Sequence, residues 1–259
     1  MKFASLGSGS EGNALLISSR SGTTSTTVML DCGFGIRETE RRLARVQLAP
    51  ENLSAIVVTH EHQDHVGGVF KFARRHRIPV WLSYGTYQAV HDRCEEVDLH
   101  FCRDGDALAI GDLLLQPYTV PHDANEPIQY VASDGACRLG VLTDAGHATA
   151  HMIEALGGCD SLLLECNHDV QMLRDSAYPP FLKHRIGGDY GHLSNDAAAA
   201  ILEAIDRSRL RRVVGAHLSS KNNTPALARA AMESVVGNSL EIAIACQEDG
   251  FGWLEIGPD

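Results

Sequence analysis

Four residues with metal-binding side chains lie within the six positions from 60 to 65. The stretch follows 55–59, an apolar and β-branched run that predicts a buried strand, and precedes 66–75, which predicts a helix. A loop between two rigid elements can turn alternate side chains inward, so donors this close in sequence can converge. Divalent metal ions favour such a mixture of imidazole and carboxylate, and the pattern therefore predicts a metal site rather than a solvated loop rich in histidine. The donors are His60, His62, Asp64 and His65.

Three more candidate ligands share one local pattern, because each comes at the end of an apolar run that predicts a strand. A single histidine in this position is usually a structural residue held by local hydrogen bonds. Where several such residues accompany a loop of four donors, we expect them to meet that loop at one edge of the strands. The three are His122 after 113–120, Asp144 after 138–143 and His217 after 212–216.

Strand and helix patterns are mixed along the whole chain, which is typical of an α/β protein. Helices are predicted over 195–207, with Ser194 as the N-cap, and from Pro225, where Thr224 is the N-cap. Two β-rich halves with helices outside predict a four-layer αββα sandwich whose sheets pack face to face. With 259 residues, 44% hydrophobic content and no low-complexity linker, we expect one domain over 1–259. The other predicted strands are 2–6, 14–18, 27–31, 128–132, 161–165 and 241–246.

Cysteine usage and hydropathy indicate a cytoplasmic protein. The seven cysteines are odd in number and show no paired spacing, which suits a reducing compartment. No apolar run is long enough to span a bilayer, and the N-terminus has no apolar segment of a signal peptide. We expect no membrane partner, no cysteine in the metal site, and packed thiols at Cys32, Cys137, Cys166 and Cys246.

The net charge of −11 excludes a broad basic surface for non-specific binding of nucleic acid. It leaves room for a phosphate substrate, because two divalent cations and local basic clusters can create a positive field at one place. Most such clusters are solvated helix faces. The basic clusters lie at 41–45, at 74–77 and over 174–185.

The seven candidate ligands together match the ligand order of the metallo-β-lactamase fold superfamily, and this resemblance covers essentially the whole chain. It implies that His60, His62 and His122 hold one metal ion, and that Asp64, His65 and His217 hold the other. It also implies that Asp144 and a hydroxide bridge the two ions, so that solvent is the nucleophile. The cofactors are then two divalent ions, with zinc, manganese and iron all compatible with the donors.

Segments in the second half resemble the YycJ (WalJ) family of bacterial proteins. These segments are 165–174, 178–179, 191–195 and 216–223. Two segments in the first half, 8–13 and 121–123, resemble the same family. The resemblance implies metal-dependent phosphodiester hydrolysis, including 5′ to 3′ exonuclease action on DNA. A dimer is common among such relatives, so a homodimer is a further expectation.

Related nucleases and cyclic phosphodiesterases carry an extra histidine shortly before the last ligand, and His192 occupies that place. An imidazolium there stabilises charge on the phosphate or protonates the leaving oxygen. The expected catalytic residues are His192, in this role, and the metal-binding Asp64. The other interpretation is a histidine near a helix N-terminus held by local hydrogen bonds. Expected substrate contacts are His168, Arg174, Lys183, Arg185 and Asn222.

Three other functions compete with a DNA exonuclease. A small-molecule cyclic phosphodiesterase would use the same site. A thioester or lactam hydrolase is a weaker alternative, because it has no evident use for His192 and the basic residues near it. A non-catalytic, metal-bound regulatory module needs only one ion in a closed site.

Overall fold

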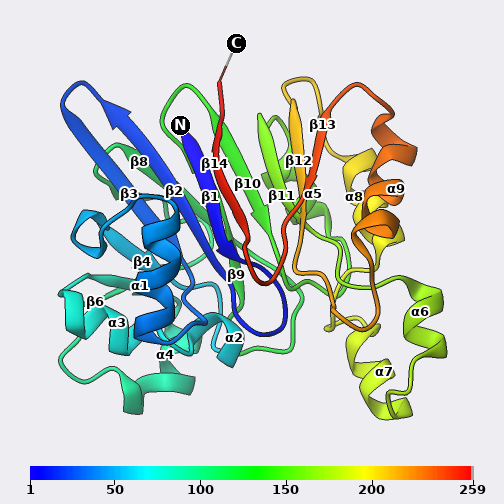
Figure 1. Cartoon of the computed structure of the whole chain (residues 1–259), viewed down its shortest axis with the longest axis horizontal. Helices are drawn as coiled ribbons and strands as arrows, with labels where there is room; N and C mark the ends of the chain where they lie inside the picture. Colours follow the sequence, from blue (N-terminus) through cyan, green and yellow to red (C-terminus); the bar gives the residue numbers. More distant parts are fainter. Residues whose placement is uncertain (258–259) are drawn as a thin grey trace.

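The structure, a computed structural model, describes residues 1–257 and contains two seven-stranded sheets with helices outside them (Figure 1). The first sheet has the strand order β14 (Phe251–Glu255), β1 (Lys2–Gly7), β2 (Ala14–Ser21), β3 (Thr24–Leu30), β4 (Ala55–Val57), β5 (Val80–Leu82) and β6 (Leu99–Phe101). The second has the order β13 (Glu241–Ile244), β12 (Arg212–Ala216), β11 (Ser161–Glu165), β10 (Arg138–Leu142), β9 (Ile128–Ser133), β8 (Leu113–Thr119) and β7 (Leu108–Ile110).

Helices cover the outer face of each sheet, which confirms the predicted four-layer αββα sandwich (Figure 1). The first sheet is covered by α1 (Ile36–Arg45), α3 (Val69–His76) and α4 (Tyr84–Val90), and the second by α5 (Ala150–Leu156), α8 (Asn195–Ala204) and α9 (Pro225–Val236). The remaining helical elements are α2 (Gln63–Val66), α6 (Val170–Asp175), α7 (Pro180–Ile186) and the short turns η1 (Pro50–Asn52) and η2 (His91–Arg93).

Continuous apolar runs form the central strands because both faces of each sheet are buried. Successive side chains of a strand point to opposite faces. In β2, Leu15 and Ile17 therefore pack between the sheets, whereas Leu16 packs under the helices of the first sheet. In β11, Leu163 packs between the sheets, and Leu164 packs against the helices of the second. Three apolar layers thus hold the four layers of secondary structure together.

Parallel pairing brings several strand ends to one edge of the sandwich. Strands β10, β11 and β12 are parallel neighbours, so their carboxyl ends lie side by side. Asp144 follows β10, Glu165 ends β11, and His217 follows β12. In the first sheet β3 and β4 are parallel, and Asp31 and the loop from His60 follow them. Side chains that can bind a metal ion or transfer a proton therefore lie at the carboxyl ends of strands from both sheets.

Two predicted helix boundaries differ from the structure. The segment predicted as one helix over 66–75 begins at the last residue of α2 and covers most of α3, and Gly67 and Gly68 separate the two helices. The backbone amide of Gly68 donates to the Cys32 carbonyl at 2.8 Å, and this close approach interrupts the helix. The helix predicted to reach 207 ends at Ala204, because Ile205 has extended backbone angles.

One cysteine prediction is wrong: Cys246 is exposed, whereas Cys32, Cys137 and Cys166 are buried. Cys246 follows β13 and faces the turn at Gly250, outside the apolar layers. All seven cysteines are free thiols. Within residues 1–257, no helix has the length and apolarity needed to cross a lipid bilayer.

Gly68 gives a test of the packing beneath the metal-binding loop. A Cβ at Gly68 would lie 1.8 Å from the Phe34 carbonyl oxygen, a contact that requires backbone movement. We expect Gly68→Ala to lower the free energy of unfolding by about 2 kcal/mol or more, measured by urea denaturation. Gly252→Ala is the matched control, since a Cβ there meets nothing within 4 Å. Equal stability of the two variants would contradict this account of the packing.

Candidate metal centre

The loop after β4 is held in place by the carboxylate of Asp31. Asp31 has a left-handed backbone (φ 60°) at the end of β3. Its oxygens accept hydrogen bonds from the Thr59 amide and hydroxyl, both at 2.8 Å, and Oδ2 lies 2.8 Å from His65 Nδ1. Because Nδ1 is bonded in this way, Nε2 of His65 faces Asp144. Asp31 therefore fixes both the loop and the direction of one candidate ligand.

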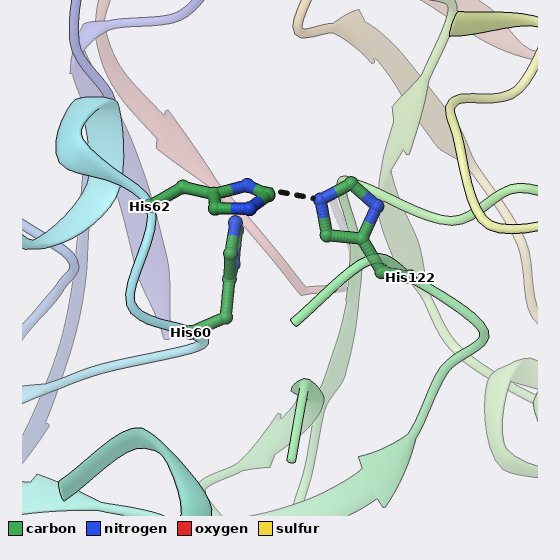
Figure 2. Close-up of side chains that lie close together, drawn as sticks. All are labelled: His60, His62 and His122. Atoms are coloured by element: carbon green, nitrogen blue, oxygen red, sulfur yellow. Dashed lines mark hydrogen bonds between the residues drawn. The ribbon is translucent and has the colours of Figure 1, made fainter. Parts of the chain in front are cut away.

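His60, His62 and His122 form the first group of candidate ligands (Figure 2). Their rings converge from two separate loops, with ring centroids 4.6 to 5.0 Å apart. His122 Nε2 lies 3.2 Å from His62 Nδ1. The outer nitrogens of two rings have partners, since His60 Nδ1 lies 2.9 Å from the Thr59 hydroxyl and His122 Nδ1 lies 2.9 Å from the Gly191 carbonyl. The nitrogens that remain face a common point, as ligands of one cation do.

Asp64, His65 and His217 form the second group. Oδ2 of Asp64 lies 3.4 Å from His217 Nε2 and 3.6 Å from His65 Nε2. Asn13, from the glycine-rich loop after β1, donates its backbone amide to the Asp64 carbonyl at 2.8 Å. In the same loop, the Ser8 hydroxyl accepts from the His217 amide at 2.8 Å. The glycine-rich loop after β1 therefore supports two candidate ligands.

Asp144 lies between the two groups. It is 1% exposed and has a left-handed backbone (φ 58°) after β10. Its Oδ2 is 3.1 Å from His65 Nε2, and its Oδ1 is 3.3 Å from His217 Nδ1 and 4.0 Å from His122 Nε2. The structure thus brings all seven predicted ligands into one cluster, with this carboxylate at the centre.

The cluster fits divalent metal ions. Among the described residues, His60 Nε2 is a buried polar atom without a hydrogen-bond partner, an arrangement that is costly unless a ligand binds it. Burial lowers the pKa of His60 well below its ordinary value, and neighbouring His65 lowers it further. A neutral imidazole is the form that binds a cation. Imidazole and carboxylate donors of this kind accept zinc, manganese or iron.

Glu165 is a functional residue that was missed in the sequence. It is fully buried, and its Oε1 lies 2.8 Å from His192 Nδ1 and 3.2 Å from His217 Nδ1. Its Oε2 accepts from the backbone amides of Ala145 and Leu193. Burial opposes ionisation of Glu165, but the adjacent His192 imidazole lowers its pKa to about 2. In turn, burial lowers the pKa of His192, and Glu165 outweighs this and raises it above the ordinary value.

A pocket of about 310 Å³ opens onto the cluster. His192 and Arg185 line it together with Asp64, Asp144 and His217. The predicted catalytic pair, Asp64 and His192, therefore faces one space. Arg185 donates to the Asp123 carboxylate at 2.7 Å, which places its guanidinium at the rim.

The other predicted substrate residues are not all near this pocket. His168, Arg174 and Lys183 line a neighbouring cavity that also contains His192. Asn222 lines neither space. It is fully buried in a turn, where its backbone amide and its side-chain amide both donate to the Ser219 hydroxyl.

The role of Asp31 can be tested through metal affinity. Asp31→Asn keeps the size of the side chain but removes the charge that polarises His65. We expect zinc affinity to fall about 10- to 100-fold, measured by competition with a chromophoric chelator. Asp92→Asn, which removes an exposed carboxylate on η2, is the control. An unchanged zinc affinity in Asp31→Asn would contradict the assigned role.

Comparison with known proteins agrees with this geometry. A family profile described as "Beta-lactamase superfamily domain" matches residues 26–218. The chain is 32% identical over 255 residues to Exodeoxyribonuclease YycJ of Bacillus anthracis, with 97% of this chain and 91% of the relative covered. It is 32% identical over 237 residues to Exodeoxyribonuclease WalJ of Streptococcus pneumoniae, with 89% and 86% covered.

A solved structure shows the same fold at low sequence identity. Zn(2+)-bound PqqB from Methylobacterium extorquens superposes with a TM-score of 0.75 at 16% identity, and the match covers 99% of this chain and 100% of that one. The profile, the two relatives and the common fold extend over most of the chain. The chain therefore belongs to the beta-lactamase superfamily and, within it, to the family that includes the YycJ and WalJ proteins.

Proposed function

We propose that the protein is a metal-dependent phosphodiester hydrolase that acts as a 5′ to 3′ exonuclease on DNA. The observation that carries the proposal is the single cluster in which seven metal-binding side chains meet beside a histidine held by a buried carboxylate. The relatives named exodeoxyribonucleases, which match nearly the whole chain, support DNA as the substrate. The seven free cysteines support action in the cytoplasm.

The proposed cofactors are two divalent ions, zinc or manganese, with iron also compatible. His60, His62 and His122 would hold one, Asp64, His65 and His217 the other, and Asp144 would contact both. When bound, two such ions lower the pKa of a coordinated water and neutralise charge on a phosphate. The proposed single domain and the homodimer stay predictions.

His192 has the position of a proton donor. Its Nδ1 is bonded to Glu165, so the ring is fixed and Nε2 remains for the substrate. The side chain is 23% exposed and lines the pocket over the cluster. From there an imidazolium can hold a proton at Nε2 and donate it to a phosphate oxygen or to the leaving oxygen. A thioester or lactam hydrolase is a weaker alternative, because it has no evident use for His192 together with basic residues.

An assay on end-labelled DNA tests the activity. With manganese or zinc, we expect the wild type to shorten a 5′-phosphorylated oligonucleotide from its 5′ end, and His192→Ala to be slower about a hundredfold or more. His151→Ala, which removes an exposed histidine on α5, is the matched control and should retain full activity. If the wild type leaves DNA intact but cleaves bis(p-nitrophenyl) phosphate, the protein is a small-molecule phosphodiesterase and the nuclease proposal fails.

Metal content separates the enzyme from a regulatory module. We expect the purified protein, loaded with zinc or manganese and dialysed, to hold two ions per chain by mass spectrometry of the metal. Stripping with EDTA should abolish hydrolysis, and adding metal back should restore it. One tightly held ion with no turnover would favour the module.

A further inference from the structure

A second cavity, of about 530 Å³, lies beside the metal pocket, and the two share His192. Helices α6 and α7 and the start of α8 form its walls. Figure 1 shows α6 and α7 at the lower right, as a pair that projects beyond the layered sheets. The pair connects β11 to α8, so it stands next to the strand end that carries Glu165.

The side chains around this cavity are basic, although the chain as a whole is acidic. Arg174, Lys183 and His184 line it, and none of the aspartates and glutamates within residues 1–257 does. Lys183 Nζ donates to the Arg174 carbonyl at 2.6 Å, which holds the ammonium group at the end of α6. This bond to a neutral oxygen leaves the positive charge uncompensated. The local field therefore favours an anion.

His168 contributes a polar ring to the wall of the cavity. The residue is 3% exposed and lines the cavity together with Gly187, and a Cβ at Gly187 would lie 3.8 Å from His168 Nε2. The backbone fixes its place, because the His168 carbonyl accepts from the Asn195 amide at 2.9 Å. The imidazole therefore offers a polar ring nitrogen, Nε2, on the cavity side.

The beginning of α8 adds a further preference for negative charge. This helix has ten residues, and its N-cap Ser194 accepts from the Ala197 amide at 3.1 Å. Both residues line the cavity. The hydroxyl hydrogen of Ser194 remains available to an anion, and the helix dipole favours negative charge at this end.

We propose that this cavity binds the 5′-terminal phosphate of a DNA strand, while the next phosphodiester lies in the metal pocket on the other side of His192. The inference rests on the proposed exonuclease function and adds the means by which the enzyme recognises a strand end. A terminal phosphate carries about −1.5 to −2 charges, whereas each internal phosphate carries one. A basic cavity therefore prefers the terminal group. Val170 and Leu173 supply an apolar wall for the adjoining sugar or base.

Binding without catalysis is the direct test. Fluorescence anisotropy in EDTA compares three forms of one labelled single-stranded oligonucleotide, with a 5′-phosphate, with a 5′-hydroxyl, and with a 3′-phosphate on a 5′-hydroxyl strand. We expect the wild type to bind the 5′-phosphorylated form roughly tenfold or more tightly than the other two. Inorganic phosphate should compete only weakly, since it lacks the rest of the strand.

Two variants change the cavity in different ways. Arg174→Ala removes a charge. Gly187→Leu fills space without backbone strain, because a Cβ at Gly187 meets Leu173, the Lys183 carbonyl and His168 at 3.4 to 3.8 Å, all ordinary contacts. Both should lose the preference for the 5′-phosphate. Arg37→Ala removes an exposed charge on α1 and should keep it.

The outcomes separate this proposal from the proposed function. Equal binding of the 5′-phosphate and 5′-hydroxyl forms by the wild type would overturn the subsite, even if DNA is degraded in the assay with metal. Equal binding of the 3′-phosphate form, or a preference that survives both variants, would also overturn it. A 5′-phosphate preference lost in both variants supports the subsite, even if no DNA cleavage is found and the nuclease proposal fails.

Discussion

A buried carboxylate at the end of β10 is the constraint on which the rest of the site depends. Asp144 is almost completely shielded from water, and an isolated ionised carboxylate in such a place is very costly. Imidazoles on both sides compensate the charge, with His65 at 3.1 Å and His217 at 3.3 Å. The sandwich must therefore bring histidines from two different sheets to this carboxylate. Its left-handed backbone, shared by Asp31 and His217, indicates strain that the surrounding layers maintain for function.

Carboxylates behind the histidines make the cluster rigid. Asp31 binds the outer nitrogen of His65, and Glu165 binds those of His192 and His217. Each carboxylate is itself held by backbone amides, Asp31 by that of Thr59 and Glu165 by those of Ala145 and Leu193. Ring orientation is therefore set by two carboxylates that lie at the ends of strands. This pre-organisation is what a site needs when its donors are so far apart in the sequence.

The donors and the layers could be predicted from sequence because both leave a periodic or local pattern. Continuous apolar strand patterns predicted the αββα sandwich. The donor-rich loop at 60–65, with three residues at strand ends, predicted the seven ligands. Asp31 and Glu165 also end predicted strands, so the same sequence pattern marks them. Their role, however, depends on which histidine each carboxylate contacts, and the pattern does not contain that information. Helix limits depended on contacts at single atoms, such as that of Gly68 with the Cys32 carbonyl. Asn222 lies within a matched segment, 216–223, yet its turn buries it away from both cavities.

The distribution of charge resolves the conflict between an acidic chain and a phosphate substrate. A net charge of −11 repels DNA over most of the surface, so long stretches of backbone gain little from contact. Basic side chains gather where α6 and α7 leave the layered fold, next to His192. The strand ends of the two sheets thus provide a general hydrolytic centre. Helices α6 and α7 add a local positive field beside it. Such a surface suits binding of the end of a DNA strand better than binding along a duplex. A local positive field can attract a short anionic segment while the rest of the DNA makes no contact with the protein.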